Sequence, residues 1–236
     1  MPIRPSLSWA RDTSLALLDL LYPPRCLGCG ASMPSADEPL CAACVRLLDR
    51  PLPHEVTAHI HRLEKAKQAV STARALWSFD AGGIVQQLQH ALKYANRPSH
   101  GRALGRLMGQ ALVAGDPTCD LILPIPLHHT RQLERGYNQS ALLADGLSQE
   151  TGLPVRSDVL LRIRPTRSQT NLSRNERQDN VRGAFAVKQP LTVRGLGVWL
   201  IDDVLTTGST ASAAAASLHD AGADEVHVYT LAFARR

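Results

Sequence analysis

The sequence has no long hydrophobic run. Its apolar segments fall well short of the roughly 18 residues that a membrane-spanning helix needs. The N-terminus also lacks the basic start, long apolar centre and small-residue cleavage site of a secretory signal. These absences argue against a membrane-spanning or exported protein, and we expect a cytoplasmic one.

Lysine is also scarce, with only four lysines among the 26 basic residues. The basic residues outnumber 21 acidic ones and leave a net charge of +5, so nearly all of the positive charge is arginine. Arginine favours forked recognition of phosphate or carboxylate. A surplus this small permits binding to nucleic acid without requiring it. The 236 residues, 44% of them hydrophobic, suffice for one domain of about 150 residues and a small appendage.

Four of the five cysteines form two CxxC pairs separated by a short segment. These residues are Cys26, Cys29, Cys41 and Cys44. In a reducing compartment such pairs are typical of thiolate metal ligands and not of disulfides. A closed set of four sulfurs predicts a structural Zn²⁺ site that holds the fold together without doing chemistry. A redox CxxC motif or an iron site is the alternative.

Other candidate ligands lie outside this set. His54, His59 and His61 follow the second CxxC pair, but the four-cysteine set is already complete, so we expect solvated histidines. Cys119 stands alone at the start of an apolar run. It is predicted to be a small core residue and not a nucleophile.

The chain divides into four predicted segments. They are an N-terminal helix within residues 1–22, a zinc-ribbon module at 23–50, a linker at 51–70 that is rich in Pro, His and Lys, and an α/β domain at 71–236. Within this domain we expect strands at 72–79, 120–126, 159–163, 184–187, 198–201 and 225–234. We expect helices at 84–92, 101–114, 140–150 and 211–221. Continuous apolar strands indicate a mostly parallel sheet covered by helices on both faces.

The most informative stretch is residues 198–210, in which a buried strand is followed by two acids and a hydroxyl-rich turn. The acids are Asp202 and Asp203, and the turn consists of Thr206, Thr207, Gly208, Ser209 and Thr210. The turn opens a helix, where backbone N–H groups without helical partners and the positive end of the helix dipole suit a phosphate. The acids suit vicinal hydroxyls or a hydrated divalent cation. The stretch therefore predicts a site for a ribose 5-phosphate. The alternative is that the acids only end a strand and the hydroxyls only cap a helix.

A second polar loop, residues 127–139, follows the expected strand at 120–126. Because carboxyl ends of neighbouring strands meet at one edge of a sheet, this loop is predicted to lie beside the acids. Arg131, Arg135 and the amides around Gly136 and Asn138 could then hold pyrophosphate oxygens. An ordinary solvated loop, with its arginines paired to Glu134, is the alternative.

The span 164–182 contains five arginines, two acids and little that is apolar. We expect it to form a mobile basic flap that closes on the substrate, where arginine would meet the charge of a departing pyrophosphate. A contact surface for nucleic acid is the alternative, although this span has no aromatic residue for stacking bases. An ordinary solvated loop also remains open.

The stretch 198–210 resembles the signature with which type I phosphoribosyltransferases bind 5-phosphoribosyl 1-diphosphate (PRPP). Taken together, several segments resemble the ComF family of competence-associated proteins. They are the paired CxxC motifs, Leu92-Lys93-Tyr94, residues 124–139, Arg167-Ser168-Gln169 through Val181, and residues 202–210. The resemblance implies a zinc ribbon before a phosphoribosyltransferase-like domain, and a part in handling DNA that enters the cell as a single strand.

Two functions follow from the resemblance. As a transferase, the protein would hold PRPP and Mg²⁺ with Asp202 and Asp203, while a set of basic residues would stabilise the leaving diphosphate. These residues are Lys93, Arg135, Arg167 and Arg174. No residue is an obvious base for the acceptor. As an adaptor, the ribbon and the Arg-rich span would contact single-stranded DNA or a helicase partner during DNA uptake.

Overall fold

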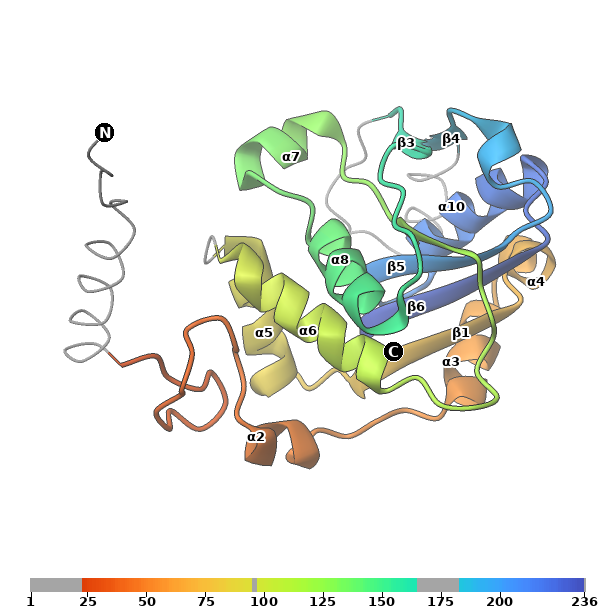
Figure 1. Cartoon of the computed structure of the whole chain (residues 1–236). Coiled ribbons are helices and arrows are strands. Elements are labelled where there is room, and N and C mark those ends of the chain that lie inside the picture. Colours follow the sequence, from red (N-terminus) through yellow and green to blue (C-terminus); the bar gives the residue numbers. More distant parts are fainter. Residues whose placement is uncertain (1–22, 95–96, 165–182, 236) are drawn as a thin grey trace, which may run out of the picture.

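The computed structural model describes residues 23–94, 97–164 and 183–235 (Figure 1). The predicted helix within residues 1–22 and nearly all of the Arg-rich span lie outside these residues. No described helix is long and apolar enough to cross a membrane.

A four-stranded parallel sheet forms the centre of the molecule. Its strands are β1 (Thr72–Ser78), β2 (Leu121–Pro124), β5 (Gly197–Leu205) and β6 (Glu225–Phe233), in the order β1-β6-β5-β2. Asp202 of β5 pairs with Thr230 of β6. All four strands run the same way, so the loops after their carboxyl ends gather at one edge. The predicted α/β class with a mostly parallel sheet is confirmed.

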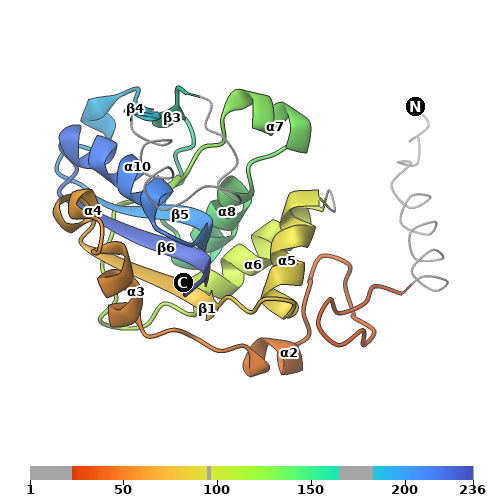
Figure 2. The ribbon, with the colours of Figure 1, turned by 180° about the vertical axis from the view of Figure 1, so that it is seen from behind.

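Helices cover both faces of this sheet, as Figures 1 and 2 show from opposite sides. One face carries α5 (Ile84–Tyr94), α6 (Pro98–Gln110) and α8 (Gln139–Thr151). The other carries α3 (Pro53–Ile60), α4 (Glu64–Ala69) and α10 (Ser209–Asp220). Each layer encloses one cluster of buried apolar side chains, so the sheet is covered on both sides as its apolar strands require.

Helices α6 and α8 pack through glycines. A Cβ atom at Gly105 would lie 2.1 Å from the carbonyl oxygen of Leu143, and one at Gly146 would lie 2.0 Å from that of Arg102. The backbones of α6 and α8 are therefore in close contact at this crossing. This contact fixes α8 against α6 and sets the position of the N-terminal end of α8.

The predicted linker at 51–70 is instead mostly helical, because it contains α3 and α4. Pro53 occupies the first turn of α3, where proline is well tolerated, and Val56 and Ile60 lie four residues apart on one buried face. Because this segment is rich in Pro, His and Lys, its amphipathic helical pattern was not recognised in the sequence. This segment packs on β1 and β6 as part of the α/β core.

Two further strands lie outside the main sheet. β3 (Leu160–Arg162) and β4 (Phe185–Val187) pair with each other in antiparallel fashion, and the Arg-rich span connects them. The segment predicted as a polar loop after β2 instead contains a helix, α7 (His129–Arg135), followed by Gly136 with a φ of 79°. The 3₁₀ helix η2 (Pro190–Thr192) precedes β5.

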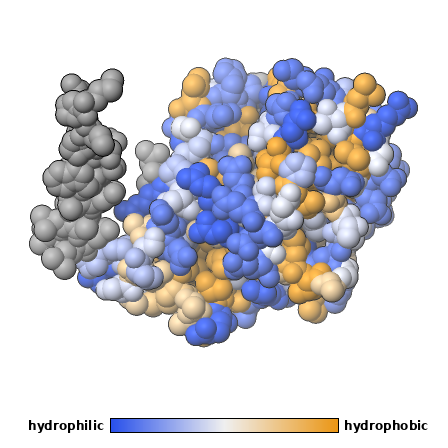
Figure 3. Space-filling view, viewed as in Figure 1, coloured by the Kyte–Doolittle hydropathy of each residue, from blue (hydrophilic) through white to orange (hydrophobic). Residues whose placement is uncertain are grey.

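The four-cysteine module contains α2 (Ala42–Leu47) and packs on α5 and α6. Met33, Leu40 and Cys44 belong to the same buried cluster as Trp77 and Leu88. The Nε2 atom of His100 in α6 lies 2.9 Å from the carbonyl oxygen of Ala36, which adds a polar contact to this packing. On the face in Figure 3, hydrophilic residues cover most of the surface and smaller hydrophobic areas lie among them.

Candidate functional site

The four cysteines converge as a metal site requires. Their sulfur atoms all lie within 4.8 Å of one another, and Sγ of Cys29 lies 3.8 Å from Sγ of Cys41. Sulfurs at the corners of a tetrahedron around Zn²⁺ are about 3.8 Å apart when each Zn–S bond is about 2.3 Å. The donor set therefore fits a structural Zn²⁺ ion with no open position.

Backbone N–H groups point at these sulfurs. Those of Gly28 and Cys41 lie 3.4 and 3.3 Å from Sγ of Cys26. Burial raises the pKa of the Cys26 thiol, but these and other backbone donors outweigh it and lower the pKa to about 6. Burial instead raises the pKa of Cys44 to about 12. A Cβ atom at Gly28 would lie 2.8 Å from Sγ of Cys44, so the turn leaves no space for a side chain there.

The two acids lie at the carboxyl end of β5, and each is held by a polar side chain. The Oγ of Ser140 donates to Oδ1 of Asp202 at 2.9 Å, and Nζ of Lys93 lies 3.0 Å from Oδ2 of Asp203. Ser140 lies in the first turn of α8 and Lys93 in the last turn of α5, so two helices of one layer meet the acids here. Burial, together with the neighbouring Asp203, raises the pKa of Asp202 to about 7.

The hydroxyl-rich turn connects β5 to α10. Gly208 has a φ of 81°, which lets the chain turn sharply into the helix. The Oγ1 atom of Thr207 lies 3.0 Å from Oγ of Ser209, so the two hydroxyls are close together. Within the part of the chain that the structure describes, the backbone N–H of Thr207 has no hydrogen-bond acceptor. We call residues 206–210 the phosphate loop.

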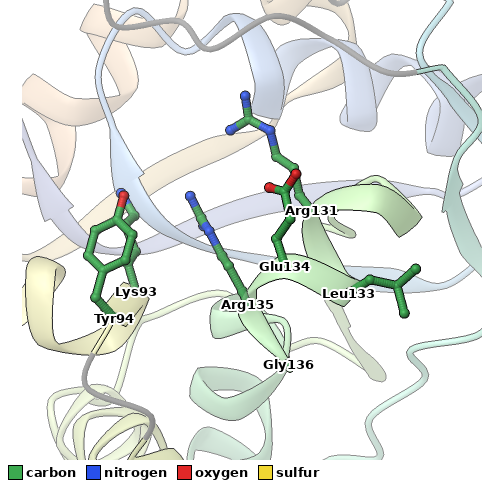
Figure 4. Close-up of a pocket in the computed structure, with 7 residues that line it drawn as sticks. All are labelled: Lys93, Tyr94, Arg131, Leu133, Glu134, Arg135 and Gly136. Atoms are coloured by element: carbon green, nitrogen blue, oxygen red, sulfur yellow. The ribbon is translucent and has the colours of Figure 1, made fainter.

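A cavity of about 630 Å³ lies beside the C-terminal end of α5. Its lining residues are Lys93, Tyr94, Arg131, Leu133, Glu134, Arg135 and Gly136 (Figure 4). In Figure 4, Arg131 and Arg135 extend in the same general direction, while Leu133 points away. Three cations therefore line the cavity, and Lys93 connects it to Asp203.

The predicted site residues of the second loop divide into two groups. Arg131, Arg135 and Gly136 line the cavity. Asn138 instead caps α8, because its Oδ1 accepts from the N–H of Ser140 and its Nδ2 donates to the carbonyl oxygen of Ile125. Arg167 and Arg174 lie outside the described residues.

Three further residues at the site were not predicted from the sequence. Ser140 holds Asp202, and Gln139 accepts from Nη1 of Arg135 at 3.2 Å. Nε2 of His59 lies 2.6 Å from the carbonyl oxygen of Thr206, so the expectation of solvated histidines is wrong for His59. It is also wrong for His61, whose Nε2 lies 2.8 Å from the carbonyl oxygen of Val70. Their contacts depend on the folding of α3, which the composition of this segment concealed.

Comparison with known proteins found similarities both to the cysteine-rich N-terminal part and to the rest of the chain. Residues 17–56 match the family model described as a double zinc ribbon domain. The described part of this chain holds one four-cysteine cluster.

The similar proteins include Competence protein F of Haemophilus influenzae, which is 29% identical over 223 residues. That match covers 88% of this chain and 96% of the relative. The DNA utilization protein YhgH of Salmonella typhi is 38% identical over 149 residues, or 61% of this chain. The matched part spans 65% of that relative's length, slightly less than two thirds. Competence protein ComFC of Bacillus subtilis is 35% identical over 112 residues, which cover 47% of this chain and 43% of the relative.

Among solved structures, similar chains include the glutamine PRPP amidotransferase from B. subtilis and the adenine phosphoribosyltransferase from Leishmania tarentolae. The match to the first has a TM-score of 0.42 and 24% identity, and it covers 60% of this chain and 30% of the amidotransferase chain. The second has a TM-score of 0.37 and 16% identity, with coverages of 63% and 74%. The chain is therefore similar to competence and DNA utilization proteins over most of its length, and to a double zinc ribbon domain at its N-terminal end.

Proposed function

We propose that this protein binds PRPP together with Mg²⁺ and promotes transfer or hydrolysis at C1 of the ribose. The observation that carries this proposal is the meeting of three features at one edge of the sheet. Paired acids lie near the carboxyl end of β5, a hydroxyl-rich turn opens α10, and a cavity lined by three cations adjoins them. Each feature suits a different part of a phosphoribosyl diphosphate.

The phosphate loop would hold the 5-phosphate. Backbone N–H groups at the start of α10 and the hydroxyls of Thr207 and Ser209 are donors for its oxygens. The turn at Gly208 brings the backbone close to the ligand, because a glycine has no side chain in the way. The 5-phosphate would therefore fix one end of the sugar without taking part in bond breaking.

Asp202 and Asp203 would hold the ribose hydroxyls, since carboxylate oxygens accept from vicinal hydroxyl groups. They also offer the hard oxygen ligands that Mg²⁺ prefers, and Mg²⁺ would neutralise charge on the diphosphate. Nζ of Lys93 lies 3.0 Å from Oδ2 of Asp203. Ligand binding would therefore be accompanied by a rearrangement of this ion pair.

The cavity would hold the diphosphate. Breaking the bond between C1 and the diphosphate oxygen leaves both bonding electrons on the leaving group, so negative charge grows there. Arg131 and Arg135 line this cavity, and fixed cations in a partly enclosed site stabilise such charge. Arg167 and Arg174, which lie outside the described residues, would add to them.

Calorimetric titration with PRPP and Mg²⁺ tests this proposal. We expect Asp203→Asn to weaken PRPP binding about tenfold or more, because a charged contact to the sugar or its cation is lost. Asp224→Asn is the matched control, since Asp224 is an exposed acid just before β6. Equal affinity of both variants and the unmodified protein would remove the proposal.

The names of the relatives favour a second candidate, an adaptor in DNA uptake. In this function the Arg-rich span would contact the phosphates of single-stranded DNA or a helicase partner. Phosphate contacts release counterions, so binding would weaken steeply as salt rises. We expect Arg174→Ala combined with Arg177→Ala to reduce both the affinity and this salt dependence, whereas Arg194→Ala, a change to an exposed arginine outside the Arg-rich span, would not. DNA binding that is insensitive to salt would contradict the adaptor.

A further inference from the structure

Helix α3 supports the phosphate loop from the side of the core. The Nε2 atom of His59 lies 2.6 Å from the carbonyl oxygen of Thr206, the first residue of the loop. The His59 ring also meets the ring of Phe233 edge-on, with 4.9 Å between the centroids. Next to it, Ile60 is fully buried, and a Cβ atom at Gly208 would lie 2.8 Å from its Cγ1 atom. Two consecutive residues of α3 therefore contact the loop.

The contact between His59 and Thr206 has a defined direction. A backbone carbonyl oxygen only accepts hydrogen bonds, so Nε2 of His59 must carry the proton. The imidazole is therefore either the Nε2–H tautomer or the cation, and both donate this bond. The preceding carbonyl, that of Leu205, is also fixed, because the N–H of Ala234 donates to it at 2.9 Å.

The geometry of the peptide bond links this contact to the orientation of the next N–H group, that of Thr207. In a planar trans peptide the C=O of one residue and the N–H of the next point in opposite directions. A carbonyl of Thr206 that is held toward α3 therefore directs the N–H of Thr207 away from α3. Within the described residues this N–H has no acceptor, as noted above.

We infer that His59 is a positioning residue, which orients the first N–H donor of the phosphate loop toward the ligand. The inference rests on the proposed function, because it identifies that loop as the binding site of the 5-phosphate. His59 itself lies behind the loop and is bonded to its carbonyl, so it acts through the backbone of Thr206 and Thr207.

Two substitutions at His59 separate the hydrogen bond from packing. In His59→Leu the donor is lost, whereas in His59→Gln the side-chain nitrogen stands as many bonds from Cα as Nε2 of histidine and can still donate. We expect PRPP affinity, measured by calorimetry with Mg²⁺, to fall about tenfold in His59→Leu. We expect His59→Gln to restore most of it. The matched control is His61→Leu, because Nε2 of His61 also lies beside a backbone carbonyl oxygen, that of Val70, away from the loop.

Hydrogen exchange of the ligand-free protein tests the inference without PRPP. We expect faster exchange at residues 206–210 in His59→Leu than in His59→Gln or His61→Leu. Unchanged exchange in His59→Leu would overturn the inference, as would equal losses of PRPP affinity in His59→Leu and His61→Leu. If the unmodified protein binds no PRPP, the proposed function fails, and the exchange measurement still decides whether His59 orders the loop.

Discussion

Asp202 is a residue of the candidate site that lowers the stability of the folded protein. Burial and the adjacent Asp203 raise its pKa from 3.8 to about 7, although Ser140 and a backbone N–H stabilise the carboxylate. The folded protein therefore binds a proton at this residue more tightly than the unfolded chain does. Between about pH 4 and pH 7 its contribution to stability falls as the pH rises, and above pH 7 the full cost remains.

We expect Asp202→Asn to stabilise the protein at pH 8. The amide oxygen can still accept from Ser140, while the buried negative charge is removed. A shift of one pKa unit corresponds to about 1.4 kcal/mol of stability. We take a gain in stability of about 2 kcal/mol, less than the full shift implies, and this gain would raise Tm by roughly 4–8 °C. Thermal unfolding at pH 8 and pH 5.5 measures the effect, which should be smaller at the lower pH.

Asp224→Asn, a change to an exposed acid, serves as the control for this experiment. A lower Tm for Asp202→Asn at pH 8 would show that the carboxylate stabilises the fold, contrary to this account. PRPP binding by the same variant should be weaker, since a ligand of the proposed site is altered.

The sequence identified the residues with a strong local pattern. Asp202, Asp203 and the phosphate loop are adjacent along the chain, so their arrangement follows from one strand, one turn and one helix. Ser140 and His59 reach the same place from helices that are 62 and 147 residues away from their partners. Contacts of this kind depend on tertiary packing, which no local pattern contains.

Among the helices, α5 connects the two predicted sites, the four-cysteine cluster and the paired acids. A Cβ atom at Gly28 would lie 3.0 Å from Cδ1 of Ile84, so the first turn of α5 adjoins the cysteine cluster. Its last turn carries Lys93, which pairs with Asp203. In addition, the hydroxyl of Tyr137 donates to the carbonyl oxygen of Leu92 at 2.9 Å. The position of Lys93 thus depends on how α5 is seated between the zinc ribbon and α6.

We expect removal of zinc by a chelator to lower Tm strongly and to speed hydrogen exchange in α5, because the four-cysteine site holds the ribbon against this helix. Metal analysis should find one zinc per cluster in the unmodified protein. Cys44→Ser should lose that zinc.

Cys119→Ser should keep the zinc, since Cys119 lies outside the cluster. Burial raises the pKa of the Cys119 thiol to about 12, so it is also a poor thiolate ligand. Full zinc content in Cys44→Ser, or an unchanged Tm after complete removal of zinc, would contradict the structural role.

Elements were predicted more reliably than their connections. The main strands and most helices follow from apolar runs and spacing, as in β5 and α5. The helices α3 and α7 were missed because their composition is polar or rich in proline. The pairing of β3 with β4 was not predicted either, since strand patterns do not state their partners.

At the scale of the whole molecule, the sheet brings distant segments to one edge. β5 lies between β6 and β2, so the turn after β5 and the segment after β2 emerge side by side. Helix α5 adds Lys93 from one layer, and α3 supports the phosphate loop from the other. We propose that this edge binds a phosphoribosyl diphosphate.

A crystal structure of the protein with PRPP and Mg²⁺ tests this claim most directly. We predict the 5-phosphate on the backbone N–H groups of the phosphate loop, the ribose hydroxyls at Asp202 and Asp203, and the diphosphate toward Arg135. Density for PRPP at another place, or a phosphate loop that stays empty at saturating PRPP, would contradict the account.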